Sequence, residues 1–177
     1  VSHELIRSAA IAIALSMLAM LVYIWFRFEW QFSLASIIAL VHDVLITLGI
    51  FSILSLEVNL SIVAALLTIV GYSLNDTVVI FDRIRENLRK YSKIPIGEIS
   101  DISTNETLSR TVITSLTTLL ALLSIYFFGG EILKGFSFAM IIGVIIGTYS
   151  SIFVATPILN YSKVSQKSVL KGEDKNN

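Results

Sequence analysis

Two long apolar stretches, each containing one aspartate, decide how this chain folds: FSLASIIALVHDVLITLGIFSIL at Phe32–Leu54 and LSIVAALLTIVGYSLNDTVVI at Leu60–Ile80. Each is about 20 residues long, the length of helix that crosses about 30 Å of hydrocarbon. The short segment between them contains Glu57 and Asn59 and is polar enough to form a turn. The pattern therefore predicts a hairpin of membrane-spanning helices with an acid inside each one.

Further apolar stretches of similar length flank this hairpin, so we expect an all-α bundle of about five transmembrane helices. The predicted spans are Ser8–Phe26, Phe32–Leu54, Leu60–Ile80, Thr111–Phe128 and Phe136–Pro157. Composition agrees, because 55% of the residues are hydrophobic, only 15% are charged and the mean hydropathy is +0.81. A soluble domain has roughly a quarter charged residues. We expect Pro157 to end the last helix.

The residue types that the sequence lacks exclude several classes of function. The chain has no cysteine, which excludes disulfides, thiolate catalysis and thiolate metal sites. Its two histidines, His3 and His42, are far apart and form no metal motif. No phosphate-binding glycine loop or catalytic-triad spacing occurs. We therefore predict no enzyme activity, no metal or cofactor site and no nucleic-acid partner.

The distribution of lysine and arginine predicts the orientation, because these residues concentrate in cytoplasmic segments. With the N-terminal end outside, the outer segments contain only Arg7 and Lys134, against eleven basic residues inside. The inner residues are Arg27, Arg83, Arg85, Arg89, Lys90, Lys93, Arg110, Lys163, Lys167, Lys171 and Lys175. The predicted membrane domain covers residues 1–158. This orientation makes its loop at 81–110 cytoplasmic, together with the tail at 159–177 that follows the domain. It also implies a further span before Val1.

The loop at 81–110 contains the pattern of a short amphipathic helix. Pro95 suits the first turn of a helix, and Ile96, Ile99 and Ile102 recur at helical spacing beside acidic residues. We expect this helix to lie on the cytoplasmic membrane surface, with a solvated linker as the alternative. The tail is polar and rich in lysine, which predicts disorder.

The two intramembrane acids are the strongest functional signal. Asp43 lies near the middle of the second span and Asp76 in the cytoplasmic half of the third. An aspartate at a helix centre costs roughly 2.5–3.5 kcal/mol, and intramembrane acids commonly mark ion or proton pathways. A structural hydrogen bond is the alternative. Counted from the turn, their depths differ by about 4–5 Å, so we expect both acids in one layer of the bundle and in one site.

Polar residues surround Asp76 along its own helix and on the fourth span. Such a face cannot point to lipid, so it should face another helix or a wet cavity. Arg110 is either a counter-ion for Asp76 or an interfacial residue that reaches the headgroups. We expect His42 to point about 100° away from Asp43. The predicted supporting residues are Tyr72, Ser73, Asn75, Thr77, Thr111, Thr114 and Thr118.

Small residues recur at every fourth position of the fifth span. They are Gly135, Ala139, Gly143, Gly147, Ser151 and Ala155. Small residues at this spacing let transmembrane helices approach backbone to backbone. The pattern predicts a packing face, either inside the bundle or against a partner.

Several blocks resemble the SecF members of the SecD/SecF family, which belongs to the resistance–nodulation–division (RND) superfamily. They are VHDV at Val41–Val44 with TLG at Thr47–Gly49, GYSLNDTVV at Gly71–Val79, and FDRIREN at Phe81–Asn87. The stretch from Arg110 to Thr118, the turn Phe128–Gly129–Gly130 and the segment Gly143–Gly147 fit the same family in order and spacing. The resemblance covers nearly the whole chain up to Pro157.

This resemblance implies a multi-pass protein of the bacterial inner membrane that works with SecD. Such proteins use the proton-motive force, or sodium in some relatives, to promote protein translocation. The implied partners are SecD, the SecYEG translocon, a YajC-like subunit, secreted preproteins and the lipid bilayer. By position, Asp76 matches the family's intramembrane acid, Arg110 its basic partner and Asp43 a further acid.

The family pattern has six spans, with a periplasmic domain between the first and second, so this chain would match the last five. Two other functions remain open at this point. One is a fragment of a proton-coupled small-molecule exporter of the same superfamily, and the other is a passive membrane scaffold.

Overall fold

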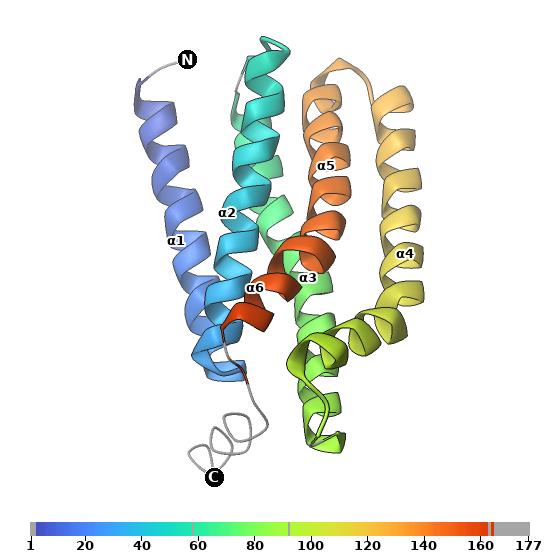
Figure 1. Ribbon diagram of the computed structural model, residues 1–177. Coiled ribbons are helices and arrows are strands. Elements are labelled where there is room, and N and C mark those ends of the chain that lie inside the picture. Colours follow the sequence, from blue (N-terminus) through green and yellow to red (C-terminus); the bar gives the residue numbers. More distant parts are fainter. Residues whose placement is uncertain (1–2, 58, 92, 163, 165–177) are drawn as a thin grey trace.

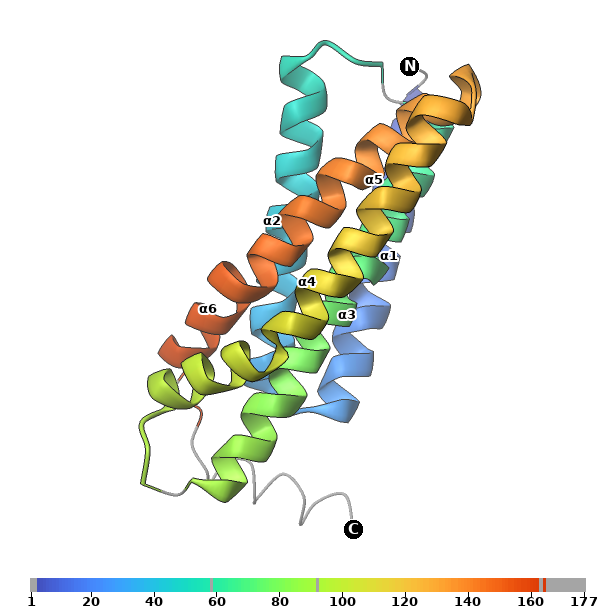
Figure 2. The same cartoon turned by 90° about the vertical axis from the view of Figure 1, so that its right-hand side faces the viewer.

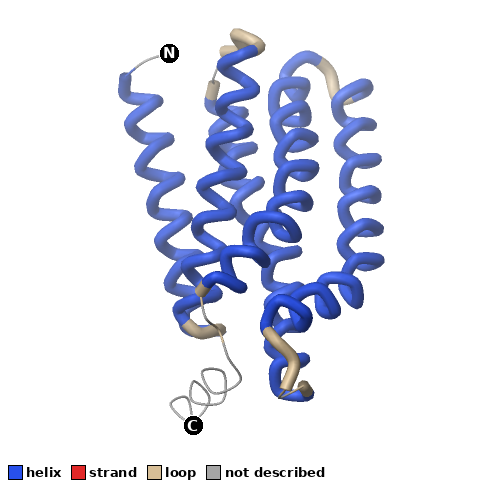
Figure 3. Tube along the Cα trace, in the orientation of Figure 1, coloured by secondary structure: helices blue, strands red, loops and turns tan. Residues whose placement is uncertain are grey.

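The computed structural model describes residues 3–57, 59–91, 93–162 and 164, and these residues form helices joined by short turns (Figure 3). The helices are α1 (His3–Arg27), α2 (Trp30–Ile53), α3 (Leu60–Lys90), α4 (Ile96–Phe128), α5 (Glu131–Ser150), the π-helical turn η1 (Ser151–Ala155) and α6 (Thr156–Tyr161). Five helical stretches are long and apolar enough to cross a membrane, which confirms the predicted all-α multi-pass fold. Most of the tail that was predicted to be disordered, at 165–177, lies outside the described residues.

The helices α3 and α5 form the centre of the bundle and share its largest interface. The helix α4 packs on one side of this pair, α2 packs on the other, and α1 lies at the outer edge against α2 and α3 (Figures 1 and 2). The turns α2–α3 and α4–α5 lie at the same end of the bundle as the N-terminus, and the turns α1–α2 and α3–α4 lie at the opposite end (Figure 1). The turns therefore alternate between the two ends, as expected when each long helix crosses the bundle once.

The helix α4 is bent, so its first part runs across the end of the bundle and the rest runs along α5 (Figure 1). Thr107 Oγ1 donates to the carbonyl of Ser103 at 2.9 Å, and Ser103 Oγ donates to the carbonyl of Ile99 at 2.7 Å. Hydroxyls that bond back to the preceding turn favour bending. The expected amphipathic helix is therefore present, but it is continuous with the fourth span. Ser100 bonds Asn160 of α6 at 2.6 Å, so this segment packs on protein instead of lying alone on the membrane surface.

The helix α3 extends to Lys90, well beyond the predicted end of the span at Ile80. Contacts with other segments hold this extension. Arg83 pairs with Glu106 of α4 at 2.6 Å, and Arg27 at the end of α1 pairs with Asp82 at 3.3 Å. The loop predicted at 81–110 is therefore almost entirely helical.

The prediction that Pro157 ends the last helix was wrong, because α6 continues to Tyr161. Proline lacks the N–H that an α-helix would direct at the preceding turn. The chain adopts the π-helical turn η1 immediately before it, and Thr156 Oγ1 donates to the carbonyl of Ser151 at 3.0 Å. Pro157 then occupies the first turn of α6, where a missing donor is tolerated. Single π-helical turns occur frequently at functional sites.

The turn between α4 and α5 depends on its glycines. Gly130 has φ +78°, a conformation that residues with a side chain rarely adopt. A Cβ atom on Gly129 would lie 2.4 Å from the carbonyl oxygen of Ile125. The pair therefore allows an abrupt reversal at the predicted position.

Candidate functional site: two buried carboxylates inside the bundle

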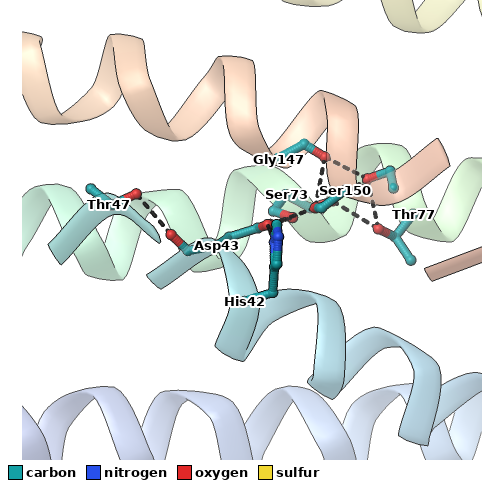
Figure 4. Close-up of polar contacts among 8 residues, drawn as sticks. His42, Asp43, Thr47, Ser73, Thr77, Gly147 and Ser150 are labelled. Atoms are coloured by element: carbon teal, nitrogen blue, oxygen red, sulfur yellow. Dashed lines mark hydrogen bonds and ion pairs between the residues drawn. The ribbon is translucent and has the colours of Figure 1, made fainter. Parts of the chain in front are cut away.

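Asp43 of α2 is completely buried, with 0% of its surface exposed, and its carboxylate joins three helices (Figure 4). Ser73 of α3 donates to Oδ2 at 2.6 Å, and Ser150 of α5 donates to the same oxygen at 2.8 Å. His42 Nδ1 lies 3.0 Å from Oδ1. The carboxylate therefore connects α2, α3 and α5 in the middle of the bundle.

His42 belongs to this group, so the prediction that it points away from Asp43 was wrong. Neighbouring residues leave a helix about 100° apart, but both side chains turn toward each other and bring Nδ1 to Oδ1. The His42 side chain is 30% exposed and that of Asp43 is 1% exposed. His42 therefore forms the outer edge of the group.

A second pair of hydroxyls continues this group along α3 and α5. Thr77 Oγ1 and Ser151 Oγ lie 2.8 Å apart, and both residues are buried. Ser151 Oγ also lies 2.9 Å from the carbonyl oxygen of Gly147, to which it donates. Because Ser151 opens the π-helical turn, the polar group of Asp43 reaches the part of the last span where the helix changes form.

Asp76 of α3 is 4% exposed and lies near residues of α4. The positive charge of Arg110 and the hydroxyl of Ser115, both on α4, act on its carboxylate. Among the described residues, Arg110 makes no direct ion pair with Asp76, and Asp76 Oδ2 is buried without a hydrogen-bond partner. Ser115 Oγ lies 2.7 Å from Thr148 Oγ1 of α5. This acid therefore has an unused acceptor oxygen inside the bundle.

The two acids lie at similar depths but in separate groups. Asp43 bonds Ser73, which is three residues before Asp76 on α3, a separation of about 4.5 Å along the helix. Within the described part of the chain, no hydrogen bond links the two carboxylates directly. The helix α5 contacts both groups, through Ser150 on one side and Thr148 on the other.

The structure places most of the predicted supporting residues inside the bundle. Ser73, Thr77 and Thr111 are buried, whereas Tyr72, Thr114 and Thr118 are half-buried. Asn75 is exposed, so no other described helix of this chain covers it. It lies about 100° around the helix from Asp76. In the described residues that side of α3 remains uncovered.

Sequence reasoning missed Ser150 and Thr148, the two residues of α5 that link the acidic groups. The polar residues Thr148, Ser150 and Ser151, clustered in an otherwise apolar span, were an available signal, but the small-residue pattern accounted for the same segment. Carboxylates and hydroxyls of this kind can exchange a proton or bind a small cation. Among the described residues, no three His, Cys, Asp or Glu side chains are grouped to hold a metal ion.

The small residues of the last span face α3. A Cβ atom on Gly143 would lie 2.2 Å from Cγ1 of Ile69, and one on Gly147 would lie 3.1 Å from Cβ of Ser73. At Gly135 the nearest atom of Ile62 is 3.8 Å away, an ordinary contact. Ala139 and Ser151 are completely buried. The backbones of α3 and α5 therefore approach closely. This approach places Ser150 of α5 beside Ser73 of α3, and both serines bond Asp43 of α2.

Together, the fold and the site define a class: multi-pass helical membrane proteins with acids buried inside the bundle. The family model described as "Protein export membrane protein SecD/SecF, C-terminal" matches residues 1–165. The chain therefore belongs to the SecD/SecF family, which confirms the family indicated by its sequence blocks.

SecF proteins are among the curated relatives that the chain matches. It is 54% identical over 166 residues to the protein translocase subunit SecF of Cereibacter sphaeroides, covering 94% of this chain and 51% of the relative. It is 58% identical over 159 residues to that of Rickettsia akari, covering 90% and 52%. The chain thus spans about half the length of these relatives.

Solved structures of SecDF have the same fold. The crystal structure of SecDF in its super-membrane-facing form gives a TM-score of 0.84 at 44% identity, covering 99% of this chain and 23% of that one. The structure of SecDF from Thermus thermophilus, described as a translocon-associated membrane protein, gives 0.86 at 48% identity, covering 90% and 22%.

Proposed function

We propose that this chain is the membrane part of a SecF-type subunit that uses the proton-motive force, together with SecD, to promote protein translocation across the inner membrane. The names of the relatives support the translocation role, since they are called protein translocase subunit SecF. The buried acids support the coupling to an ion. We further propose that the SecYEG translocon, a YajC-like subunit and secreted preproteins are its other partners.

The observation that carries the coupling is the environment of Asp76. Burial favours the protonated form of a carboxyl group, whereas a nearby arginine favours its charged form. Asp76 is buried and Arg110 is within electrostatic range, so the two influences oppose each other at one side chain. Its unpartnered oxygen is available to a proton. Sodium is the alternative ion.

The energy of one proton is large enough to drive a conformational change. A proton that crosses the membrane releases roughly 2.3 kcal/mol per 100 mV, which shifts a two-state equilibrium about fiftyfold. In the proposed cycle, charged Asp76 is attracted to Arg110 on α4, and protonated Asp76 is released from it. The relative positions of α3 and α4 would then follow the protonation state.

The proposed partner SecD fits the uncovered face of α3. Thr68, Gly71 and Asn75 lie along this face and are exposed. Polar and small residues at such spacing are typical of contacts between transmembrane helices, and an asparagine amide is unfavourable against lipid. In the solved SecDF chains, the matching region is less than a quarter of the polypeptide. We therefore assign this face to a helix of SecD.

The function is tested with the Asp76→Asn variant of the full-length protein, expressed together with SecD. Asparagine keeps the size and loses the exchangeable proton, so export that depends on the proton-motive force should fall to the level of cells lacking the protein. Arg110→Ala should lose the same activity. The double variant should be no worse than either single variant, because both residues serve one step.

The control is Asp101→Asn, which makes the same change at an exposed position on the first part of α4. It should export at the wild-type rate, which would be measured as the maturation of a secreted reporter protein. Wild-type export by the Asp76→Asn variant at normal expression would leave only the scaffold function.

A further inference from the structure

An apolar cavity of about 500 Å³ lies between α1, α2 and α3, and neither buried acid lines it. The helix α1 lies close to α2 at their shared turn and diverges from it toward the N-terminus (Figure 1). The cavity occupies the space at this diverging end, which is the end predicted to face the periplasm. Ile6 and Ile13 line it from α1, Leu48 from α2 and Leu66 from α3.

Two alanines of α1 leave the cavity unfilled. Ala9 and Ala10 belong to its lining, and a single methyl group on each does not reach across to α2 or α3. On the far side, Val63 and Leu66 of α3 are 6% and 2% exposed, so the cavity extends to the core of the bundle. Ile6 and Ala10 are exposed. The cavity is therefore a recess in the side of the bundle that opens to the hydrocarbon of the bilayer.

Polarity changes along the recess. Its two polar lining residues are Ser52 in the last turn of α2 and Glu57 in the α2–α3 turn, whereas the rest of the lining is apolar. From Ile6 to Ile13 the recess extends about 10 Å along α1, within the roughly 15 Å of hydrocarbon in one leaflet. An apolar cavity stays dry. The recess therefore matches a phospholipid, with an apolar part for a chain and a polar end for a headgroup.

Two opposite charges lie at the polar end. Glu57 belongs to the lining, and Arg7 comes next to Ile6 on α1. Both side chains are exposed, and neither forms an ion pair with another described residue. An arginine binds phosphate oxygens through charge-assisted hydrogen bonds, and a carboxylate accepts such bonds from a primary ammonium group. Phosphate and primary ammonium together are the headgroup of phosphatidylethanolamine.

The size of the recess favours an acyl chain over a further helix. One turn of an α-helix about 10 Å wide and 5.4 Å long fills roughly 400 Å³. A cavity of about 500 Å³ would therefore hold little more than one turn of a helix, although it extends over about two turns of α1. A flexible acyl chain is narrow enough to follow this length.

We propose that the recess binds one acyl chain of phosphatidylethanolamine, whose headgroup lies between Arg7 and Glu57 at the membrane surface. The chain fills the space beside Ala9 and Ala10 and completes the packing of α1 on α2 and α3. This lipid site depends on neither the ion coupling nor the export activity proposed above.

Photo-crosslinking tests the position of the chain. The full-length protein with SecD is placed in vesicles that contain phosphatidylethanolamine with a photoreactive diazirine in one acyl chain, and the linked residues are identified by mass spectrometry. Crosslinks should concentrate at 6–13 and 48–57, above the exposed face of α1 around Leu15 and Leu18. A uniform distribution over α1 would overturn the site. Crosslinks to α1 that spare the recess would also overturn it, and a protein segment would then be the occupant.

A matched pair of tryptophan variants tests the recess itself. Ala10→Trp fills the cavity and should lower the crosslinks at 48–57 severalfold. Ala19→Trp makes the same change nine residues later, on the opposite, exposed side of α1, and should leave them unchanged. Equal crosslinking by the two variants would overturn the site.

The headgroup contact is tested with vesicles that contain equal amounts of phosphatidylethanolamine and phosphatidylcholine. The quaternary ammonium of phosphatidylcholine has no hydrogen to donate to Glu57, so native mass spectrometry of the purified complex should find phosphatidylethanolamine retained in preference. Glu57→Gln should reduce this preference severalfold. Glu131→Gln, which changes an exposed glutamate at the same end of the bundle, should keep it. Equal retention of both lipids by the unmodified protein would overturn the headgroup contact.

Discussion

Asp43 and Asp76 differ in what surrounds their carboxylate oxygens. Both oxygens of Asp43 have partners, from His42 on one side and from Ser73 and Ser150 on the other. Oδ2 of Asp76 has none among the described residues. A proton can reach the open oxygen without displacing a donor, whereas both oxygens of Asp43 already have hydrogen-bond partners in His42, Ser73 and Ser150. Asp76 is therefore the better candidate for exchange on every cycle, and Asp43 for holding the helices together.

Asp43→Asn should consequently lower stability more than it lowers export. The neutral amide oxygen accepts more weakly from Ser73 and Ser150 than the carboxylate does, because hydrogen bonds to charged groups contribute about 1.5–3 kcal/mol against about 1 kcal/mol for neutral ones. The melting temperature of the protein in detergent should fall, and export should fall only in part. Ser150→Ala removes one donor and should cost less, about 1 kcal/mol. Complete loss of export at an unchanged melting temperature would instead make Asp43 an ion carrier.

At the scale of elements, α5 is the helix that contacts both acidic groups. Ser150 bonds Asp43, and Thr148 bonds Ser115 beside Asp76. Its glycine face rests directly on α3, and the π-helical turn η1 follows immediately. A displacement of α5 along α3 would therefore alter both groups at once.

The glycine face gives a sharp test of this packing. Gly143→Ala places a methyl group 2.2 Å from Ile69, so the interface must shift and should lose about 1–3 kcal/mol of stability. Gly135→Ala is the matched control, because its methyl group meets Ile62 at 3.8 Å and should be tolerated. Ile69→Ala removes the obstructing atoms and should partly restore Gly143→Ala. Melting temperatures in detergent measure all three, and equal values for both alanine variants would contradict the contact.

The helices were predictable where local composition decides them. An apolar stretch of about 20 residues crosses the membrane whatever its neighbours are, so the hairpin around Asp43 and Asp76 could be predicted. The extension of α3 to Lys90 could not, because it depends on the ion pair between Arg83 and Glu106, residues far apart in the sequence. The contact of Ser150 with Asp43 could not be predicted for a related reason. A serine beside small residues suits a packing face as well as it suits a carboxylate partner.

In the whole molecule, the two ends of the bundle differ in the number of charged residues that they contain. The end with the α1–α2 and α3–α4 turns contains Arg27, Arg83 and Arg85, together with their carboxylate partners (Figure 1). The opposite end contains Lys134, which pairs with Glu131. A cavity between α3 and α4, lined by charged residues that include Arg83 and Glu106, lies at the first of these ends. The orientation of the bundle in the membrane therefore decides which compartment this cavity faces.

Single cysteines at Glu57 and Lys93 test that orientation, since both positions are exposed, in the α2–α3 and α3–α4 turns respectively. With eleven basic residues on one side and two on the other, the α3–α4 turn should be cytoplasmic. An impermeant maleimide should label Glu57→Cys in cells with a permeabilised outer membrane and Lys93→Cys in inverted vesicles. Detergent should expose both cysteines. Labelling of both from one side would refute the hairpin. The reverse pattern would keep the fold and place the α3–α4 turn and its charged residues on the periplasmic side.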